Sequence, residues 1–253
     1  MKGFFEGVRY LIRGLQWCAR HPRQWLFGLI PALITLVLFT GVLILLWSWT
    51  DDVAATVTPF ADDWAGGPRD AVRLLAGLAI FGAAGFLSLI LFTAVTLLIG
   101  QPFYEALAVR VEDSVGGAPP EPDTPLWQQI VRGVRDGLIL GVAAVFFAVV
   151  FFALGFIPVI GQTVVPVLAA CVSGYFLAGE LTAIALERRG LRRKQRFALL
   201  RAHRAQAVGF GAATVVLFLI PLGAVLIMPG AVAGATLLAR ERLAEAVPKS
   251  NIR

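Results

Sequence analysis

Four stretches of the chain carry no charged residue, and their lengths decide the class of protein. They cover residues 24–50, 74–104, 137–179 and 205–239, and contain 27, 31, 43 and 35 residues respectively. About 20 apolar helical residues are enough to cross the hydrocarbon core of a bilayer. The pattern therefore predicts an all-α integral membrane protein.

The two shorter runs each predict one long transmembrane helix. The first covers residues 25–49, with Trp25 and Trp47 placed like aromatic anchors at the two membrane interfaces, about 33 Å apart at helical rise. The second covers residues 74–104 and exceeds the bilayer thickness, so it is expected to tilt or project beyond the membrane. The segment Gly100-Gln101-Pro102 is expected to kink or end this helix.

The two longer runs predict helical hairpins, because each has a break at an Ile-Pro pair. The first hairpin is expected over residues 125–186 with its tip near 158–161, and the second over 205–239 with its tip near 221–223. The predicted tip residues are Pro158, Gly161 and Pro221. The arms of the second hairpin are about 24 Å long, so it is expected to penetrate the membrane only partly. The alternative is six ordinary spans with tight turns.

Residues 2–20 have the pattern of an amphipathic helix. One face carries Phe4, Val8, Leu11, Leu15 and Cys18, and the opposite face carries Lys2, Glu6, Arg9, Arg13 and Arg20. Because a membrane-spanning segment follows directly, we predict a helix that lies in the membrane interface with its basic face toward lipid headgroups. The alternative is a solvated helix packed on protein.

The composition supports one membrane domain over residues 1–253, with 58% hydrophobic residues and a mean hydropathy of +0.80. The net charge of +6 does not indicate a nucleic-acid partner, because the basic residues cluster at the ends of apolar segments. If the segments alternate, 20 of 22 basic residues lie on one side. We therefore expect both termini in the cytoplasm and the aspartate-rich loop 51–73 outside.

Enzyme chemistry finds little support, and we expect neither a metal nor another cofactor. His21 and His203 have no metal-ligand spacing to another His, Cys or carboxylate. No lysine follows a glycine-rich phosphate loop, which argues against ATP-driven transport by this chain.

The arginines near the inner face are the best candidates for binding a ligand. The planar guanidinium donates two parallel hydrogen bonds, which suits oxyanions. We expect an anion path near Arg23 and Glu105, with Arg9 and Arg13 as helpers. The alternative is a purely topological role for this charge. Glu180 interrupts an apolar stretch and is either a functional intramembrane carboxylate or a residue at the interface.

Several segments resemble the CysZ-type sulfate permease family, which also includes eukaryotic etoposide-induced membrane proteins. The most specific is Phe156-Ile157-Pro158-Val159-Ile160-Gly161-Gln162-Thr163, and looser matches are Pro102-Phe103 with Leu107-Ala108 and Val111-Glu112, and Ile220-Pro221-Leu222 through Pro229. The resemblance implies two long transmembrane helices, two partly penetrating hairpins, and assembly as a homo-oligomer. It also implies sulfate uptake through the bacterial inner membrane for cysteine synthesis.

The chain departs from the family pattern just before the first crossing. Family sulfate permeases tend to carry Pro-Gly, an apolar residue and Arg there, in a loop linked to sulfate binding, whereas this chain has Pro22-Arg23-Gln24-Trp25. A basic group is present but displaced by two residues. Two functions are therefore kept, a permease for sulfate or a related small anion, and a non-transporting membrane scaffold that organises the envelope.

Overall fold

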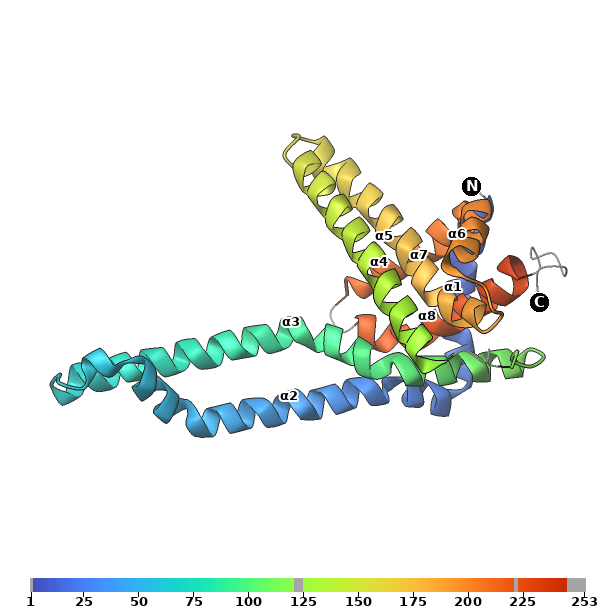
Figure 1. The fold of residues 1–253 in the computed structure, drawn as a ribbon. Coiled ribbons are helices and arrows are strands. Elements are labelled where there is room, and N and C mark those ends of the chain that lie inside the picture. Colours follow the sequence, from blue (N-terminus) through green and yellow to red (C-terminus); the bar gives the residue numbers. More distant parts are fainter. Residues whose placement is uncertain (1, 121–124, 221–222, 245–253) are drawn as a thin grey trace. The chain divides into compact units, whose positions relative to one another are not determined.

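The computed structural model describes residues 2–120, 125–220 and 223–244, which form helices joined by short turns (Figure 1). These residues include no strand, so the predicted all-α class is confirmed. The helices are α1 (Lys2–Arg20), α2 (Pro22–Val57), α3 (Gly66–Ser114), α4 (Leu126–Gly155), α5 (Ile160–Glu187), α6 (Arg193–Ala202), α7 (Arg204–Phe218) and α8 (Gly223–Leu238), with a 3-10 turn η1 (Pro59–Ala61) and a π-helical turn η2 (Ala239–Leu243).

The chain divides into two compact units, and each is described by itself. The two-helix unit is Leu29–Phe103, and the core unit is Met1–Gly28 together with Tyr104–Arg253. The single membrane domain over residues 1–253 stays a prediction.

In the two-helix unit, α2 and α3 run antiparallel. Phe39 contacts Phe92 with ring centroids 6.4 Å apart, and Trp47 contacts Phe81 at 5.2 Å. At helical rise, the 36 residues of α2 span about 54 Å and the 49 of α3 about 74 Å, so both extend beyond a hydrocarbon core of about 30 Å. The segment Gly100-Gln101-Pro102 does not end α3, because a proline removes only one backbone hydrogen bond and the helix resumes around it.

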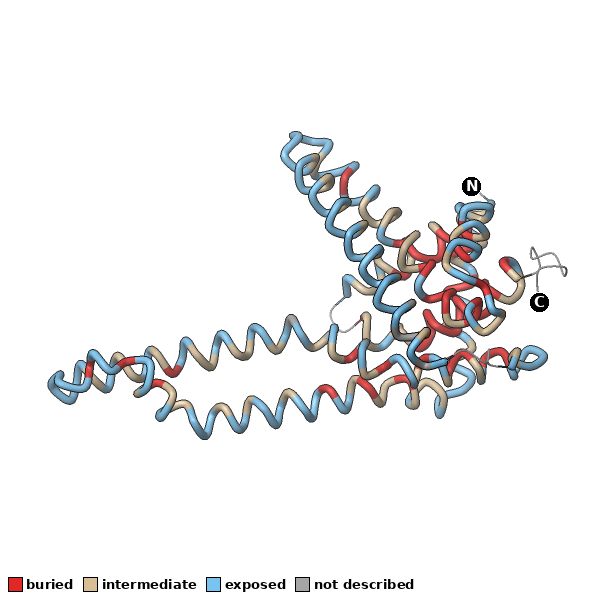
Figure 2. Tube along the Cα trace, viewed as in Figure 1, coloured by how far each residue is buried: buried red, intermediate tan, exposed pale blue. Residues whose placement is uncertain are grey.

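The core unit is built on four helices whose buried faces meet. Helix α1 packs on α7 and α8, and α5 packs on α7 (Figure 2). The apolar side chains at the centre include Leu11, Leu107, Val111, Leu186, Leu200, Phe210, Val232 and Leu238.

Glycines allow these helices to touch backbone to backbone. A Cβ atom on Gly211 of α7 would lie 1.7 Å from the carbonyl oxygen of Gly174 on α5. A Cβ atom on Gly14 of α1 would lie 2.2 Å from the carbonyl oxygen of Gly230 and 2.3 Å from the amide nitrogen of Gly234, both on α8. Close approach through small residues is the usual way in which membrane helices associate, because van der Waals contact replaces the hydrophobic effect there.

Helix α1 is present as predicted, but most of its apolar face contacts protein. Leu11 and Cys18 are buried against the core, and Leu15 packs on it. Phe5 and Ile12 are exposed, at 65% and 46%, on the face that also carries Arg9. A buried stripe thus anchors α1 to α7 and α8. The position of α1 at a membrane interface stays a prediction.

The packing of α1 predicts an unreactive thiol at Cys18. Burial raises the pKa of Cys18 from an ordinary value of 9.0 to about 12, so at a given neutral pH the thiolate fraction falls about 1,000-fold. In a Cys171→Ser background, maleimide labelling of the folded protein at pH 8 should therefore be slower than labelling of the unfolded chain by a factor of this order. Equal rates would show that α1 leaves the core.

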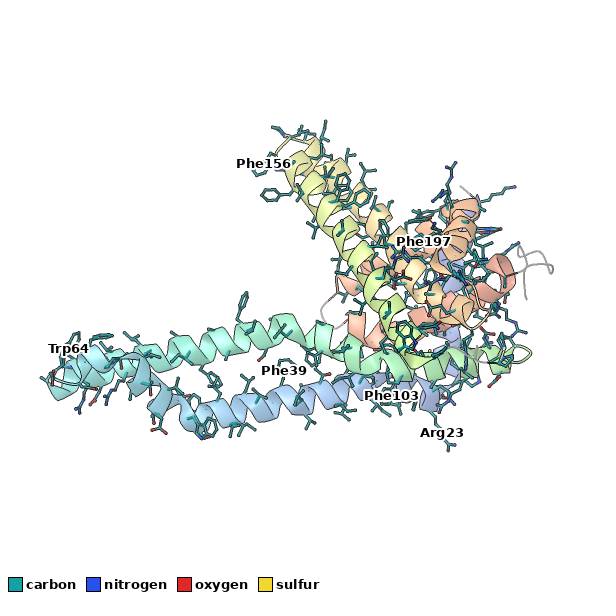
Figure 3. All side chains as sticks on the ribbon, viewed as in Figure 1. Arg23, Phe39, Trp64, Phe103, Phe156 and Phe197 are labelled. Carbon is teal, nitrogen blue, oxygen red and sulfur yellow. The ribbon has the colours of Figure 1, made fainter. Side chains whose placement is uncertain are left out.

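Helices α4 and α5 form the first hairpin, with Pro158 and Gly161 at its tip. The turn pairs its own backbone, since the Ile160 and Gly161 amides donate at 2.8 Å to the carbonyls of Pro158 and Ile157. Proline has no amide to satisfy, and a Cβ on Gly161 would lie 2.2 Å from the Gly155 carbonyl oxygen. Because few donors are left unpaired, the turn suits an environment with little water. The exposed Phe156 side chain points away from the tip (Figure 3).

The second hairpin is formed by α7 and α8, and its predicted tip residue Pro221 lies outside the described residues. Among those that are described, five helical segments are long and apolar enough to cross a membrane, which makes the chain a multi-pass membrane protein. Both arms of the first hairpin qualify, so the span count differs from the predicted two. Helix α7 has 15 residues and does not qualify, whereas α8 with η2 does and is largely enclosed by protein. Partial penetration stays a prediction.

Candidate functional site

Arg23 lies at the start of α2, and Arg110 of α3 contacts the same part of that helix, within the core unit. Arg110 of α3 donates a hydrogen bond to the Gln24 side-chain oxygen, and its guanidinium lies 4.2 Å from the ring centroid of Phe27. Arg23 is exposed and precedes Phe27 by four residues, so both lie on the same face of α2. Figure 3 shows Arg23 projecting outward. We call Arg23 and Arg110 the arginine pair.

The end of α3 is held beside the start of α2 by further contacts. The Trp17 indole donates to the Ser114 hydroxyl at 2.9 Å and stacks on the His21 ring at a centroid distance of 4.5 Å. Trp25 turns to α8 instead, where its indole donates to the Leu226 carbonyl oxygen at 3.1 Å. The first turn of α2 also exposes the positive end of a helix dipole, which favours anions.

Arg13, one of the predicted helpers, is already paired. It donates two hydrogen bonds to the Glu241 carboxylate, at 2.7 and 2.6 Å, and the Tyr10 hydroxyl donates to the same carboxylate at 3.0 Å. The bond to Glu241 raises the pKa of Arg13. Burial, followed by the contact with Glu241, raises the pKa of Tyr10. Since its charge is matched, Arg13 contributes less to attracting a free anion than its sequence position indicates.

Arg9 and Glu105 are the other two predicted residues of the anion path. Arg9 is exposed in the middle of α1, and Glu105 is exposed on α3 about one and a half turns before Arg110. Their roles stay predictions.

A buried ion pair joins three elements of the core unit. Glu112 at the end of α3 is 1% exposed and accepts two hydrogen bonds from Arg189, at 2.7 and 2.9 Å. Arg240 of η2 donates to the carbonyl oxygens of Glu112 and Gly117, at 3.2 and 2.9 Å, and so caps the C-terminal end of α3. This carboxylate therefore fixes the helix that carries Arg110.

A second charged cluster lies at the base of the first hairpin. Arg196 of α6 pairs with Glu187 at 2.5 Å and with Asp136 at 3.3 Å, and Arg193 donates to the Asp136 carbonyl oxygen at 2.7 Å. Glu180 lies within electrostatic reach of these groups. Counted in residues along α4 and α5, Asp136 and Glu180 are at nearly equal distances from the turn of the first hairpin. Glu180 therefore lies at the end of the hairpin that carries this charged cluster, rather than midway along it.

Sequence reasoning missed Gln24, Arg110, Arg189 and Glu241 as members of these sites. Their partners are far away in the chain, 86 residues for Arg110 and 228 for Glu241. The one available signal was the place of Glu112 in a family motif.

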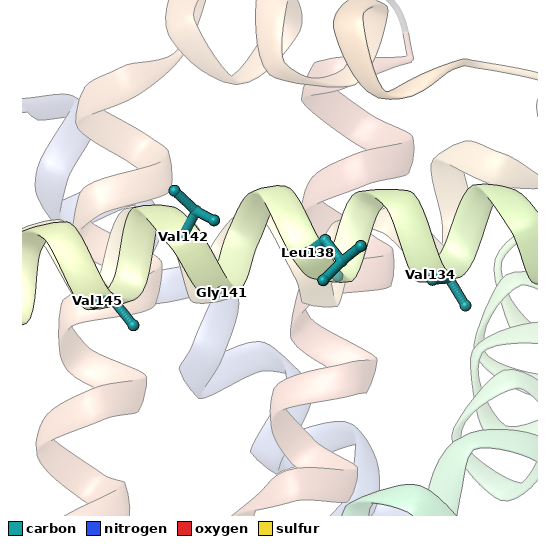
Figure 4. Close-up of a pocket in the computed structure, with 6 residues that line it drawn as sticks. Val134, Leu138, Gly141, Val142 and Val145 are labelled. Atoms are coloured by element: carbon teal, nitrogen blue, oxygen red, sulfur yellow. The ribbon is translucent and has the colours of Figure 1, made fainter.

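A shallow groove on α4 offers no ligand for an anion. It is lined by Val134, Gly137, Leu138, Gly141, Val142 and Val145, all from one helix (Figure 4). These residues present no polar side chain.

Residues 10–229 match a family model described as "Sulfate transporter CysZ/Etoposide-induced protein 2.4". The match covers most of the chain, including the start of α2, the end of α3 that carries Arg110, the first hairpin, α7 and the first part of α8. The model describes a family of membrane transporters rather than enzymes, which agrees with the multi-pass helical structure. The chain therefore belongs to the CysZ/etoposide-induced protein family.

Proposed function

We propose that the chain is a permease that carries sulfate, or a closely related oxyanion, through the bacterial inner membrane in support of cysteine synthesis. The arginine pair is the observation that carries this proposal. The family's sulfate permeases tend to have an arginine where this chain has Trp25, and the Trp25 indole bonds to α8 instead. Arg110, which belongs to α3, places its guanidinium against the face of α2 that carries Arg23 and Phe27.

The arrangement of the pair suits a tetrahedral dianion. Gln24 and Phe27 hold the plane of the Arg110 guanidinium, while Arg23 is free to turn on an exposed stem. Each guanidinium is able to donate two hydrogen bonds to sulfate, and the start of α2 adds the positive end of its dipole. Two positive charges on one face balance the charge of sulfate.

The basic inner face sets the proposed orientation. Both termini are cytoplasmic, and the acidic loop between α2 and α3 is outside. Lipid covers the apolar outer surfaces of α4 and of the two-helix unit, and further copies of the chain complete a homo-oligomer. The exposed large apolar residues on these helices are consistent with such partners.

Removing either member of the pair should reduce sulfate flux. A hydrogen bond to a charged group contributes about 1.5–3 kcal/mol, so we expect Arg23→Ala and Arg110→Ala each to weaken the apparent affinity for sulfate about 10-fold or more. The measurement is radiolabelled sulfate uptake into liposomes. Arg135→Ala, an exposed arginine on α4, is the matched control and should leave uptake unchanged. Uptake unaffected by both pair variants would rule out this site.

Glu105→Ala tests the remaining predicted pathway residue in the same assay. If Glu105→Ala lowers sulfate uptake in a protein that keeps Arg23, Glu105 belongs to the anion path. If uptake is unchanged, Glu105 is not part of that path.

The scaffold alternative rests on the exposed Phe5 and Ile12 of α1. Deleting residues 1–20 does not test it, because the deletion also removes Leu11 and Cys18 from the core. The double variant Phe5→Ser with Ile12→Ser leaves the core intact. Under the scaffold reading it abolishes the cellular phenotype while sulfate uptake is unchanged, and under the permease reading uptake and phenotype change together.

A further inference from the structure

Helix α6 carries positive charges on two faces, and only those on the inner face are paired with carboxylates. On the inner face, Arg196 is 7% exposed and pairs with Glu187 and Asp136. Leu200 is fully buried beside it. Phe197, labelled in Figure 3, contacts Tyr175 and Phe176 of α5 with ring centroids 6.3 and 6.4 Å apart. The inner cation is thus neutralised, and the helix is fixed on α5.

The outer cations have no such partner. Arg192, Lys194, Arg201 and Arg204 are exposed, and none of them forms a salt bridge within the described part of the chain. Residues 188–204 include eight Lys or Arg and no acidic residue. Tyr175 of α5 lies within electrostatic reach of Arg201, but its hydroxyl is neutral and leaves the charge of Arg201 uncompensated.

The location of this surface identifies its partner. Helix α5 is a candidate membrane span, and only residues 188–192 separate it from α6, so α6 lies at the membrane end of a crossing. Lys194 and Arg201 lie on the same flank of α6, seven residues and about 10 Å apart along the axis. Long basic side chains at this level reach the phosphates of anionic lipids.

We propose that Arg192, Lys194, Arg201 and Arg204 form a binding surface for anionic phospholipid headgroups. We call it the α6 basic surface. Its charge complements a phosphate-rich leaflet, and the two contacting helices, α5 and α7, hold it at a fixed height. The proposal is independent of the transported substrate.

The test measures phosphatidylglycerol and phosphatidylcholine bound to the full-length protein in detergent, by native mass spectrometry. Each basic residue near an anionic surface strengthens binding about fivefold, so Lys194→Ala with Arg201→Ala should weaken phosphatidylglycerol binding about 30-fold. Phosphatidylcholine binding should not change. The charge-conserving pair Lys194→Arg with Arg201→Lys should keep the preference for phosphatidylglycerol.

Equal binding of the two lipids by the unchanged protein, or an alanine pair that binds phosphatidylglycerol normally, would overturn the proposal. So would an alanine pair that keeps its lipid binding but shifts the sulfate concentration for half-maximal uptake, because the surface would then serve the substrate. If the alanine pair does not elute as a folded species, Arg192→Ala with Arg204→Ala replaces it, and the same loss is expected.

Discussion

Replacing Glu112 by alanine should destabilise the core unit by about 3–5 kcal/mol. The carboxylate is almost completely buried, and its removal leaves Arg189 without its charged partner and Arg240 beside an emptied site. A buried, unpaired charge costs far more than a surface pair contributes. Thermal unfolding of the purified protein in detergent measures the loss, with the folded fraction followed by size-exclusion chromatography.

Two matched variants separate the destabilisation caused by an unpaired buried charge from that caused by the loss of a side chain. Asp113→Ala removes an exposed neighbouring carboxylate and should cost about 1 kcal/mol or less. Glu112→Ala combined with Arg189→Ala should be more stable than Glu112→Ala alone, because neither charge is then orphaned. Equal unfolding temperatures for Glu112→Ala and Asp113→Ala would show that this ion pair does not hold the end of α3.

Replacing Gly211 by alanine should force α5 and α7 apart. The added methyl would lie 1.7 Å from the Gly174 carbonyl oxygen, and a backbone atom cannot move aside as a flexible side chain does. Overpacking typically costs about 1–3 kcal/mol, and a clash with backbone belongs at or above the upper end. A lower unfolding temperature, or loss of the folded species, is the expected result.

Gly141→Ala on α4 is the matched control for this clash. Nothing lies within 4 Å of its would-be Cβ, and alanine favours a helix over glycine by up to about 1 kcal/mol, so this variant should be neutral or slightly more stable. A Gly211→Ala protein as stable as the Gly141→Ala protein would contradict the close crossing of α5 and α7.

The helices of this fold are largely predictable from sequence, and their partners are not. Charge-free runs of this length reveal α2, α3 and the hairpins, since few other structures need so many uncharged residues. The amphipathic stripe of residues 2–20 predicted α1. The stripe did not show whether the apolar face of α1 contacts lipid or protein, because apolar side chains such as Leu11 and Cys18 are stable in either environment. The segment at Pro102 was ambiguous in the same way, because a proline is compatible with a kink, an end or a continued helix.

The candidate site was predictable only in part, for a physical reason. Helical periodicity shows which side chains share a face, but not which distant helix that face meets. Arg23 was therefore proposed from its position before the first crossing. Arg110 was not, because its neighbours Gln24 and Phe27 belong to another helix. The pairing of Arg13 with Glu241 was not predictable either, because the two residues are 228 positions apart in the chain.

The most direct test of the proposed function is radiolabelled sulfate uptake into liposomes containing the purified protein, with chloride and phosphate as competitors. A sulfate permease should show saturable uptake, with chloride and phosphate competing poorly. The combined Arg23→Ala and Arg110→Ala variant should lose this uptake. Absence of uptake by a protein shown to be folded and inserted would contradict the assignment as a sulfate permease.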